Sequence, residues 1–224
     1  MAITVLTVAN QKGGVGKTNT SVQLAVQMGL QGYGPVVIMD TDAPQGSLSK
    51  WFNQREDAEP LMAVVGEGET LEGKIKQLEE HGAKLLIIDT GPRDPEEQPI
   101  LRAALQASDI VLIPTKVGWR DAQACVPTVN FCLANNKKFV FVLNEVKPNL
   151  ALTPQSVALL SEYGPVAPGF ISSRAAYINA DANSQAAVEI EPRGPAARDI
   201  QKLIDYLVTK LPAFAKPQKE KKRV

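Results

Sequence analysis

Short apolar runs recur along the chain and alternate with segments of helical periodicity. Five of these runs are almost continuously apolar and rich in β-branched residues: 4–8, 36–39, 85–88, 110–113 and 139–143. Strands without a polar side are typical of parallel sheets that helices cover on both faces. The pattern therefore predicts five buried, mostly parallel strands.

Apolar residues at three- and four-residue spacing predict helices between and after these strands. The clearest examples contain Leu71 and Leu78, Ile100 and Leu105, and, near the end of the chain, the stretch 200–211. Thr153 is expected to cap a further helix, with Pro154 at its first position. Strands alternating with helices build right-handed βαβ units. We expect a single-domain α/β fold over residues 1–211, followed by a basic, flexible tail over 212–224.

Composition agrees with one soluble domain. The 224 residues are 44% apolar and 21% charged, as is usual for globular proteins. No apolar stretch is long enough to cross a bilayer, and the N-terminus does not resemble a signal peptide, so a cytoplasmic location is expected. Cys125 and Cys132 lie seven residues apart in an expected helix. This spacing suits neither a disulfide framework nor a CxxC metal site, and favours reduced thiols.

The charge is unevenly distributed along a chain whose net charge is zero. Residues 216–224 contain five basic residues and one acidic residue, Glu220, which gives this segment a net charge of +4. A basic tail on a slightly acidic body indicates a polyanionic partner. A tail that only aids solubility is the alternative.

Polar residues gather where the predicted strands end. The segment 10–18, NQKGGVGKT, follows the first strand, Asp40 and Asp42 follow the second, Asp89 follows the third and Asn144 the fifth. Ligands of parallel α/β folds bind at the carboxyl ends of the strands. The sequence thus places its candidate site at this edge of the sheet.

The segment 10–18 has the features of a phosphate-binding loop. Its glycines allow backbone N–H groups at a helix N-terminus to surround an anion. Lys17 would neutralise phosphate charge and the Thr18 hydroxyl would bind Mg²⁺. The residues expected to bind ATP or ADP here are Lys12, Gly13, Gly14, Val15, Gly16, Lys17, Thr18 and Asn19.

The usual pattern GxxxxGK[ST] requires glycine at position 11, where this chain has Gln11 followed by Lys12. The segment KGGxGK[ST] resembles the deviant Walker A group of ATPases, most closely the ParA family, which partitions plasmids and chromosomes or positions protein cargoes. The resemblance extends to about Leu211. It implies an ATP-dependent homodimer in which Lys12 of each chain reaches the nucleotide of the other, as an arginine finger does in other NTPases.

The segment DTDAPQ resembles the ParA switch segment. The resemblance assigns Asp42 to the attacking water and Asp40 to the magnesium shell. Ala43 is one residue more than the family pattern has between the second aspartate and Pro44. The register of Asp42 is therefore open, and Asp40 is the alternative base.

Asp89 ends a buried strand, where a carboxylate is costly without a cation or hydrogen bonds. This favours a Walker B role in which Asp89 holds Mg²⁺ through water, so the expected metal ligands are Thr18, Asp40 and Asp89. Asn144 is similar to the family's adenine-contacting asparagine; a cap of the turn after the strand is the alternative.

The partner surface decides between two branches of the family. ParA-like proteins bind nonspecific DNA on the nucleoid, whereas MinD-like proteins bind membrane through a C-terminal amphipathic helix. Pro212 and Pro217 interrupt a helix, and Phe214 is the only large apolar residue beyond Leu211, so the tail favours DNA. Arg193, Arg198, Lys202 and Lys210 are candidates to extend the basic surface.

The resemblance also implies a ParB-like or cargo-adaptor partner, whose identity and cargo the sequence leaves open. A metabolic ATP-dependent ligase or synthetase on the same fold is the alternative from a different class.

Overall fold

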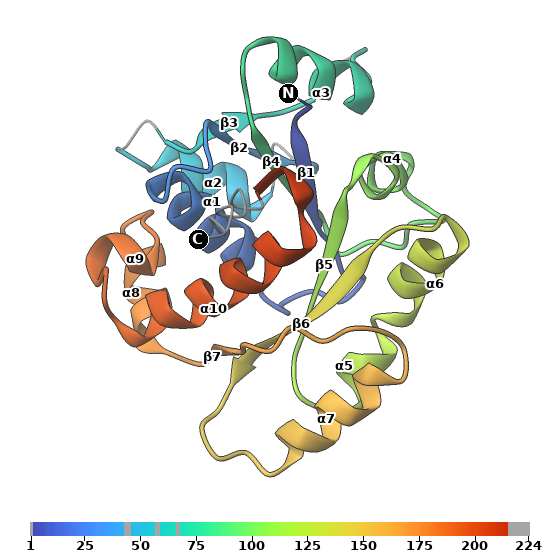
Figure 1. Cartoon of the computed structure of the whole chain (residues 1–224), viewed down its shortest axis with the longest axis vertical. Coiled ribbons are helices and arrows are strands. Elements are labelled where there is room, and N and C mark those ends of the chain that lie inside the picture. The colour runs from blue at the N-terminus through green and yellow to red at the C-terminus, as the bar shows by residue number, and fades with distance from the viewer. Residues whose placement is uncertain (1, 43–45, 57–58, 66–67, 215–224) are drawn as a thin grey trace, which may run out of the picture.

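A seven-stranded parallel sheet forms the centre of the computed structural model, which describes residues 2–42, 46–56, 59–65 and 68–214 (Figure 1). The strand order is β3-β2-β4-β1-β5-β6-β7, and each neighbouring pair is parallel. The strands are β1 (Thr4–Val8), β2 (Val36–Asp40), β3 (Leu61–Ala63), β4 (Leu85–Asp89), β5 (Ile110–Thr115), β6 (Phe139–Val146) and β7 (Ile171–Ser172).

Helices cover both faces of this sheet, as Figure 1 shows. Those packed on one face are α1 (Lys17–Leu30), α2 (Ser47–Asn53), α8 (Ala175–Asp181), α9 (Ala187–Ile190) and α10 (Pro195–Lys210). Those on the other are α3 (Leu71–Glu80), α4 (Pro99–Ala107), α5 (Trp119–Gln123), α6 (Val126–Ala134) and α7 (Leu152–Ser161). A 3₁₀ turn at Pro212–Phe214 follows α10.

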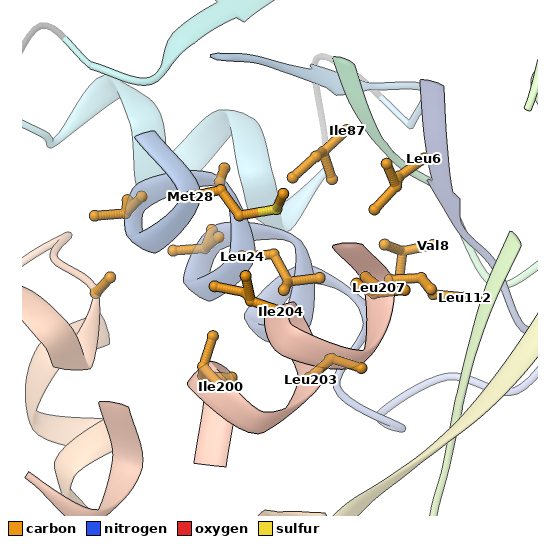
Figure 2. Packing of buried hydrophobic residues seen from close by; sticks show 14 of the residues in the cluster. Leu6, Val8, Leu24, Met28, Ile87, Leu112, Ile200, Leu203, Ile204 and Leu207 are labelled. Carbon is orange, nitrogen blue, oxygen red and sulfur yellow. The ribbon is translucent and has the colours of Figure 1, made fainter. Parts of the chain in front are cut away.

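Along a strand, the side chains of alternate residues pack against the helices on opposite faces of the sheet. In β1, Leu6 and Val8 join the cluster beneath α1 and α10, whereas Val5 faces α3 and α4. Figure 2 shows side chains of α1 and α10, among them Leu24 and Leu207, meeting those of the strands. The central strands are buried along their whole length, which is why they are apolar on both sides.

The five strands that the hydrophobic pattern predicts are confirmed, with two additional short strands at the edges of the sheet. β3 has three residues and β7 has two, and Leu61 in β3 is about half exposed. Such short edge strands lack the long apolar run that identifies a buried strand, so the pattern does not reveal them.

The expected cap of α7 is wrong. The helix begins at Leu152, and Ala151 takes the capping position, so Thr153 and Pro154 lie inside the first turn. The first amides of a helix have no intrahelical acceptor, so proline is tolerated there. The Thr153 hydroxyl is buried and has no hydrogen-bond partner among the described residues.

Both cysteines are free and buried. Burial raises the pKa of the Cys125 thiol to about 11 and that of Cys132 to about 12. Both side chains are therefore protonated thiols at neutral pH. In the part of the chain that the structure describes, no helix is long and apolar enough to cross a membrane.

Packing of α10 on the sheet gives a stability prediction. Leu207 is fully buried against β1 and β5, whereas Leu133 on α6 is 59% exposed. We expect Leu207→Ala to lower the free energy of unfolding by about 2–5 kcal/mol, because the substitution removes apolar contacts and leaves a cavity. Leu133→Ala is the control, with an expected change of under about 0.5 kcal/mol. Urea unfolding measures both, and equal losses would contradict the packing described here.

Candidate nucleotide-binding site

The loop between β1 and α1 is held in one conformation by polar anchors. Asn10 is buried; its Nδ2 donates to the Pro114 carbonyl (2.8 Å), and its Oδ1 accepts from the Lys12 backbone N–H (2.9 Å). Gly14 and Gly16 have φ values of +69° and +85°. A Cβ at Gly16 would also collide with the Asn144 amide. Glycine at position 16 is thus required by both conformation and space.

This loop presents an anion site at the N-terminus of α1. Among the described residues, no acceptor is hydrogen bonded to the amides of Gly14, Val15 and Gly16. Lys17 is buried, and its Nζ donates to the Lys12 carbonyl (3.0 Å). Burial lowers the pKa of Lys17, and the carboxylates of Asp89 and Asp42 oppose this shift. Free amides and a desolvated ammonium are what a nucleotide phosphate requires.

Asp89 lies beside the loop because β4 pairs with β1, with Val8 opposite Asp89. The carboxylate accepts from Thr18 Oγ1 (2.7 Å) and from Ser21 Oγ (3.0 Å). Burial nevertheless raises the pKa of Asp89 to about 7, because the two hydrogen bonds offset only part of the desolvation cost. The convergence of Asp89 with the loop, expected from the sequence, is present.

The oxygen atoms of Asp89 and its neighbours suit a magnesium ion that keeps water and phosphate oxygens among its ligands. The described residues contain no group of three His, Cys, Asp or Glu side chains able to enclose a metal. Mg²⁺ characteristically binds one or two protein oxygens together with phosphate and water. Thr18 and Asp89 supply hard oxygen ligands next to the phosphate site, so these residues suit the ion.

Asp40 and Asp42 occupy different environments. Asp40 is buried and accepts hydrogen bonds from the backbone N–H of Asp42 (2.8 Å) and from the N–H (2.9 Å) and hydroxyl (2.7 Å) of Ser49. Its carboxylate is therefore committed to holding α2. Asp42 is exposed, and its carboxylate lies directly beside Gly91 in the lining of the smaller cavity. Ala43, on which the register of Asp42 depends, lies with Pro44 and Gln45 outside the described residues.

Lys12 is held by a partner in its own chain. Its Nζ forms an ion pair with Asp121 Oδ1 at 2.9 Å, and the Lys12 side chain remains 41% exposed. Asp121 lies on α5, directly after the strand that anchors Asn10. The Asp121 side chain is only 16% exposed, so the ion pair is partly buried, with Lys12 as its more exposed member. Lys12 can therefore leave Asp121 favourably only when another anion takes the place of this carboxylate.

Asn144 lies beneath the loop. Its Nδ2 donates to the Val15 carbonyl (3.0 Å), and its Oδ1 accepts from the Glu145 backbone N–H (2.9 Å). The side chain is 1% exposed. Both polar atoms of the amide are thus engaged within the chain in this structure, which matches the turn-capping alternative.

Two adjoining cavities share Gly16, Thr18, Asn19 and Ser47. The smaller, about 310 Å³, is surrounded by the loop, the switch aspartates and Asp89. The larger, about 580 Å³, extends from the loop to α2 and α8. Its lining includes Trp51, Asn144, Arg174 and Tyr177. The smaller cavity suits phosphates and the larger suits a nucleoside.

The remaining predicted binding residues also lie in this region. Gly13 lines the smaller cavity and is exposed; Asn19 lines both cavities, and its Oδ1 accepts from Gln23 Nε2 (3.3 Å). Val15 is buried, and only its backbone is available to a ligand.

Sequence reasoning missed several residues of the site. Ser21 lies one helical turn after Thr18, so spacing alone could have identified it. Asp121 is 109 residues from Lys12, and no local pattern connects the two. Arg174 is likewise remote; its guanidinium binds the buried Asp199 carboxylate (2.7 Å), which orients it at the larger cavity.

Sequence comparison finds relatives that match most of this chain. Carboxysome distribution proteins A of Gloeobacter kilaueensis and Halothiobacillus neapolitanus are similar to this chain. The first is 32% identical and is matched over 88% of each chain. The second is 28% identical and is matched over 87% of this chain and 91% of its own.

Solved structures show the same fold. Apo McdA from Cyanothece superposes with a TM-score of 0.76 at 16% identity, covering 92% of this chain and 99% of that one. A plasmid partition protein from Borrelia burgdorferi bound to AMPPNP gives a TM-score of 0.72 at 16% identity, covering 93% and 100%.

A family model matches residues 6–188, which run from within β1 to within α9 and include the residues that line both cavities. The chain therefore belongs to the family of the CobQ/CobB/MinD/ParA nucleotide binding domain.

Proposed function

We propose that this protein is a ParA-like ATPase that positions a cargo through an ATP-dependent dimer. The observation that carries the proposal is the pairing of a phosphate-binding loop with an additional lysine, Lys12, held at the mouth of the site. Lys17 at the start of α1 is the lysine that binds the phosphates of its own chain's nucleotide. Lys12 is available for a second nucleotide, that of a partner chain.

The dimer supplies the charge that one site lacks. Negative charge develops on the leaving oxygen during hydrolysis, and a cation provided from another chain accelerates such reactions by roughly 10³–10⁵-fold. In a single chain, Lys12 is paired with Asp121 of that chain. ATP binding in two facing chains would exchange this partly buried ion pair for a contact with the phosphates of the partner's nucleotide.

The residues of the site have different roles in hydrolysis. Lys17 and the loop amides bind the phosphates, and Thr18 and Asp89 hold the ion, which lowers the phosphate charge when bound. Asp42 orients the attacking water, since among the described residues no hydrogen bond engages its carboxylate as Ser49 engages that of Asp40. Asp40 instead positions α2 and the switch segment through Ser49. We expect slow turnover in the isolated protein and stimulation by DNA and a partner.

The carboxysome-related names of two relatives favour a protein assembly as cargo over a plasmid. Nonspecific DNA is the proposed track, bound through the basic C-terminal region, and a ParB-like or cargo-adaptor protein is the proposed activator. The nucleoid is then the proposed location. A test is ATPase activity and electrophoretic shift with plain duplex DNA. ATP-dependent, salt-sensitive binding is expected; a metabolic ligase would instead show turnover only with its own substrate.

Removing Lys17 should remove nucleotide binding. Lys17→Ala deletes a charge-assisted contact to phosphate, so we expect ATP affinity to fall by about 10–100-fold. Isothermal titration with ATP and Mg²⁺ measures the loss. Lys76→Ala, on the exposed face of α3, is the charge-matched control. Unchanged affinity in Lys17→Ala would refute the assignment of the loop.

Variants of Lys12 and Asp121 should show that ATP binding and ATP hydrolysis depend on different residues. Lys12→Ala should retain ATP binding but lose hydrolysis, on the order of 10³-fold, because the cation supplied in trans is missing. Asp121→Asn leaves Lys12 in place without its ion pair, so turnover should be at least that of the unmodified protein. Single-turnover hydrolysis at saturating ATP measures both variants. Wild-type turnover in Lys12→Ala would exclude the trans role.

Asp42→Ala should trap the ATP-bound state. Without the carboxylate that orients water, we expect hydrolysis to stop while the ATP dimer persists on DNA. The dissociation rate from duplex DNA, followed after dilution with unlabelled DNA, measures this persistence. If the variant releases DNA as rapidly as the unmodified protein, Asp40 becomes the candidate base.

A further inference from the structure

Arg55 follows the seven-residue helix α2, and its side chain is almost completely buried. Its backbone N–H donates to the Phe52 carbonyl (3.0 Å), which attaches the residue to the last turn of α2. The Arg55 side chain is 3% exposed, and that of Glu189, its partner on α9, is 15% exposed. A buried guanidinium requires several acceptors, so the acceptors of Arg55 determine where the end of α2 lies.

Acceptors from separate parts of the chain bind this guanidinium. Nη2 donates to Glu189 Oε1 (2.6 Å) and Nη1 donates to Glu189 Oε2 (3.1 Å), so the pair is bidentate. Nη1 also donates to the Ser184 carbonyl (3.0 Å), and Nε donates to the Glu59 carbonyl (2.9 Å). A lysine ammonium could not bind both carboxylate oxygens and both carbonyls in these directions. The arrangement is therefore specific to arginine.

The guanidinium also lies over the ring of Trp51, a buried residue of α2. The distance from Arg55 Cζ to the ring centroid is 4.9 Å, which is within the range of a cation–π contact. Trp51 is 4% exposed, and its Nε1 has no hydrogen-bond partner in the part of the chain that the structure describes. The orientation of the indole thus depends on packing and on Arg55. Because Trp51 lines the larger cavity, Arg55 helps to fix a residue of that cavity.

Glu189 belongs to a segment that is tied to α1, the helix that begins at the phosphate-binding loop. Glu189 Oε2 accepts from the Ala186 backbone N–H (2.7 Å), at the start of α9. The next amide, that of Ala187, donates to Gln23 Oε1 on α1 (2.8 Å). Gln23 Nε2 in turn donates to Asn19 Oδ1 (3.3 Å), which lies in the first turn of α1. The acceptor of the guanidinium is thus fixed relative to α1.

The opposite end of α2 is bonded to the switch aspartates. Ser49 donates from its N–H (2.9 Å) and its hydroxyl (2.7 Å) to Asp40 Oδ2, and Asp40 Oδ1 accepts from the Asp42 N–H (2.8 Å). The seven residues of α2 span only about 10 Å, because an α-helix rises about 1.5 Å per residue. A shift at the end of α2 therefore reaches its first turn, and from there Asp42, through these hydrogen bonds.

A buried ion pair such as that of Arg55 with Glu189 mainly determines orientation. The attraction between the two charges is largely offset by the cost of removing them from water, so apolar side chains of similar volume often give equal stability. Apolar contacts do not fix a direction, whereas two parallel hydrogen bonds do. The pair therefore defines how α2 lies relative to α9.

We propose that Arg55 is a positioning residue for ATP hydrolysis. Through its bidentate bond to Glu189 it fixes α2, and through α2 it fixes the carboxylate of Asp42 at the smaller cavity. The inference rests on the proposed function and adds to it a residue that lines neither nucleotide cavity. Nucleotide binding depends less on Arg55, because the phosphate-binding loop is held by Asn10 and not by α2.

A double variant tests this role without leaving a buried charge unpaired. Arg55→Met combined with Glu189→Gln removes both charges and keeps side chains of similar length, so the variant is expected to fold. Leu207→Ala is the control for lost stability, because Leu207 lies on α10 against β1 and β5. Single-turnover hydrolysis at saturating ATP and Mg²⁺ gives the rate. Isothermal titration gives the ATP affinity, and urea unfolding gives the stability.

Trp51 provides a separate measurement of α2 itself. The chain has two tryptophans, and Trp119→Phe removes the other one, which is 61% exposed. In this background, acrylamide quenching of tryptophan fluorescence reports the accessibility of the Trp51 ring. We expect weak quenching when Arg55 is present. Quenching should be stronger in the double variant, because the guanidinium no longer covers the ring.

We expect the hydrolysis rate of the double variant to fall by about 10–100-fold, as small misplacements of catalytic groups cause. ATP affinity should change by less than about threefold, because the loss affects the reaction step and not binding. Arg55→Lys keeps the charge but not the bidentate geometry, so it should give an intermediate rate. Leu207→Ala should hydrolyse ATP like the unmodified protein under conditions in which both are folded.

Contrary outcomes have distinct meanings. If the double variant hydrolyses ATP at the unmodified rate, or if Leu207→Ala loses as much activity at equal stability, Arg55 is a structural residue only and the inference is overturned. The inference also fails if ATP affinity falls as steeply as the rate, because the ion pair then serves binding. An unmodified protein that binds ATP but does not hydrolyse it, alone or with DNA, would refute the proposed function instead. Quenching of Trp51 would still show whether Arg55 fixes α2, and equal quenching with and without the ion pair would overturn that claim.

Discussion

The structure of the site depends on a carboxylate, Asp89, buried at the end of a central strand. Parallel pairing of β4 with β1 places this group beside the phosphate-binding loop, where water is largely excluded. Two hydroxyls satisfy its oxygens, yet burial still raises the pKa of Asp89 to about 7. A desolvated carboxylate is most stable as an anion when a cation lies next to it. The desolvation of the Asp89 carboxylate, which is unfavourable in the free protein, therefore favours binding of a cation together with a nucleotide.

Lys17 is also a buried charged group beside the loop, but it is a cation whereas Asp89 is an anion. Burial lowers its pKa, and its ammonium has a carbonyl, that of Lys12, as its hydrogen-bond acceptor. A phosphate entering the loop supplies the negative charge that this carbonyl does not. Charges that are expensive in the free protein thus become complementary in the complex. This accounts for a site assembled on the ends of rigid, buried strands, where desolvation is greatest and the geometry is fixed.

Much of the fold and part of the site could be predicted from the sequence because their causes are local. A buried parallel strand is apolar on both sides, and the loop needs glycine where φ is positive, as at Gly16. The meeting of Asp89 with Thr18 follows from the rule that parallel strands end at one edge. By contrast, the ion pair of Lys12 with Asp121 joins residues 109 positions apart and leaves no local signal. The larger cavity escaped prediction for the same reason, since Trp51, Arg174 and Tyr177 come from separate parts of the chain.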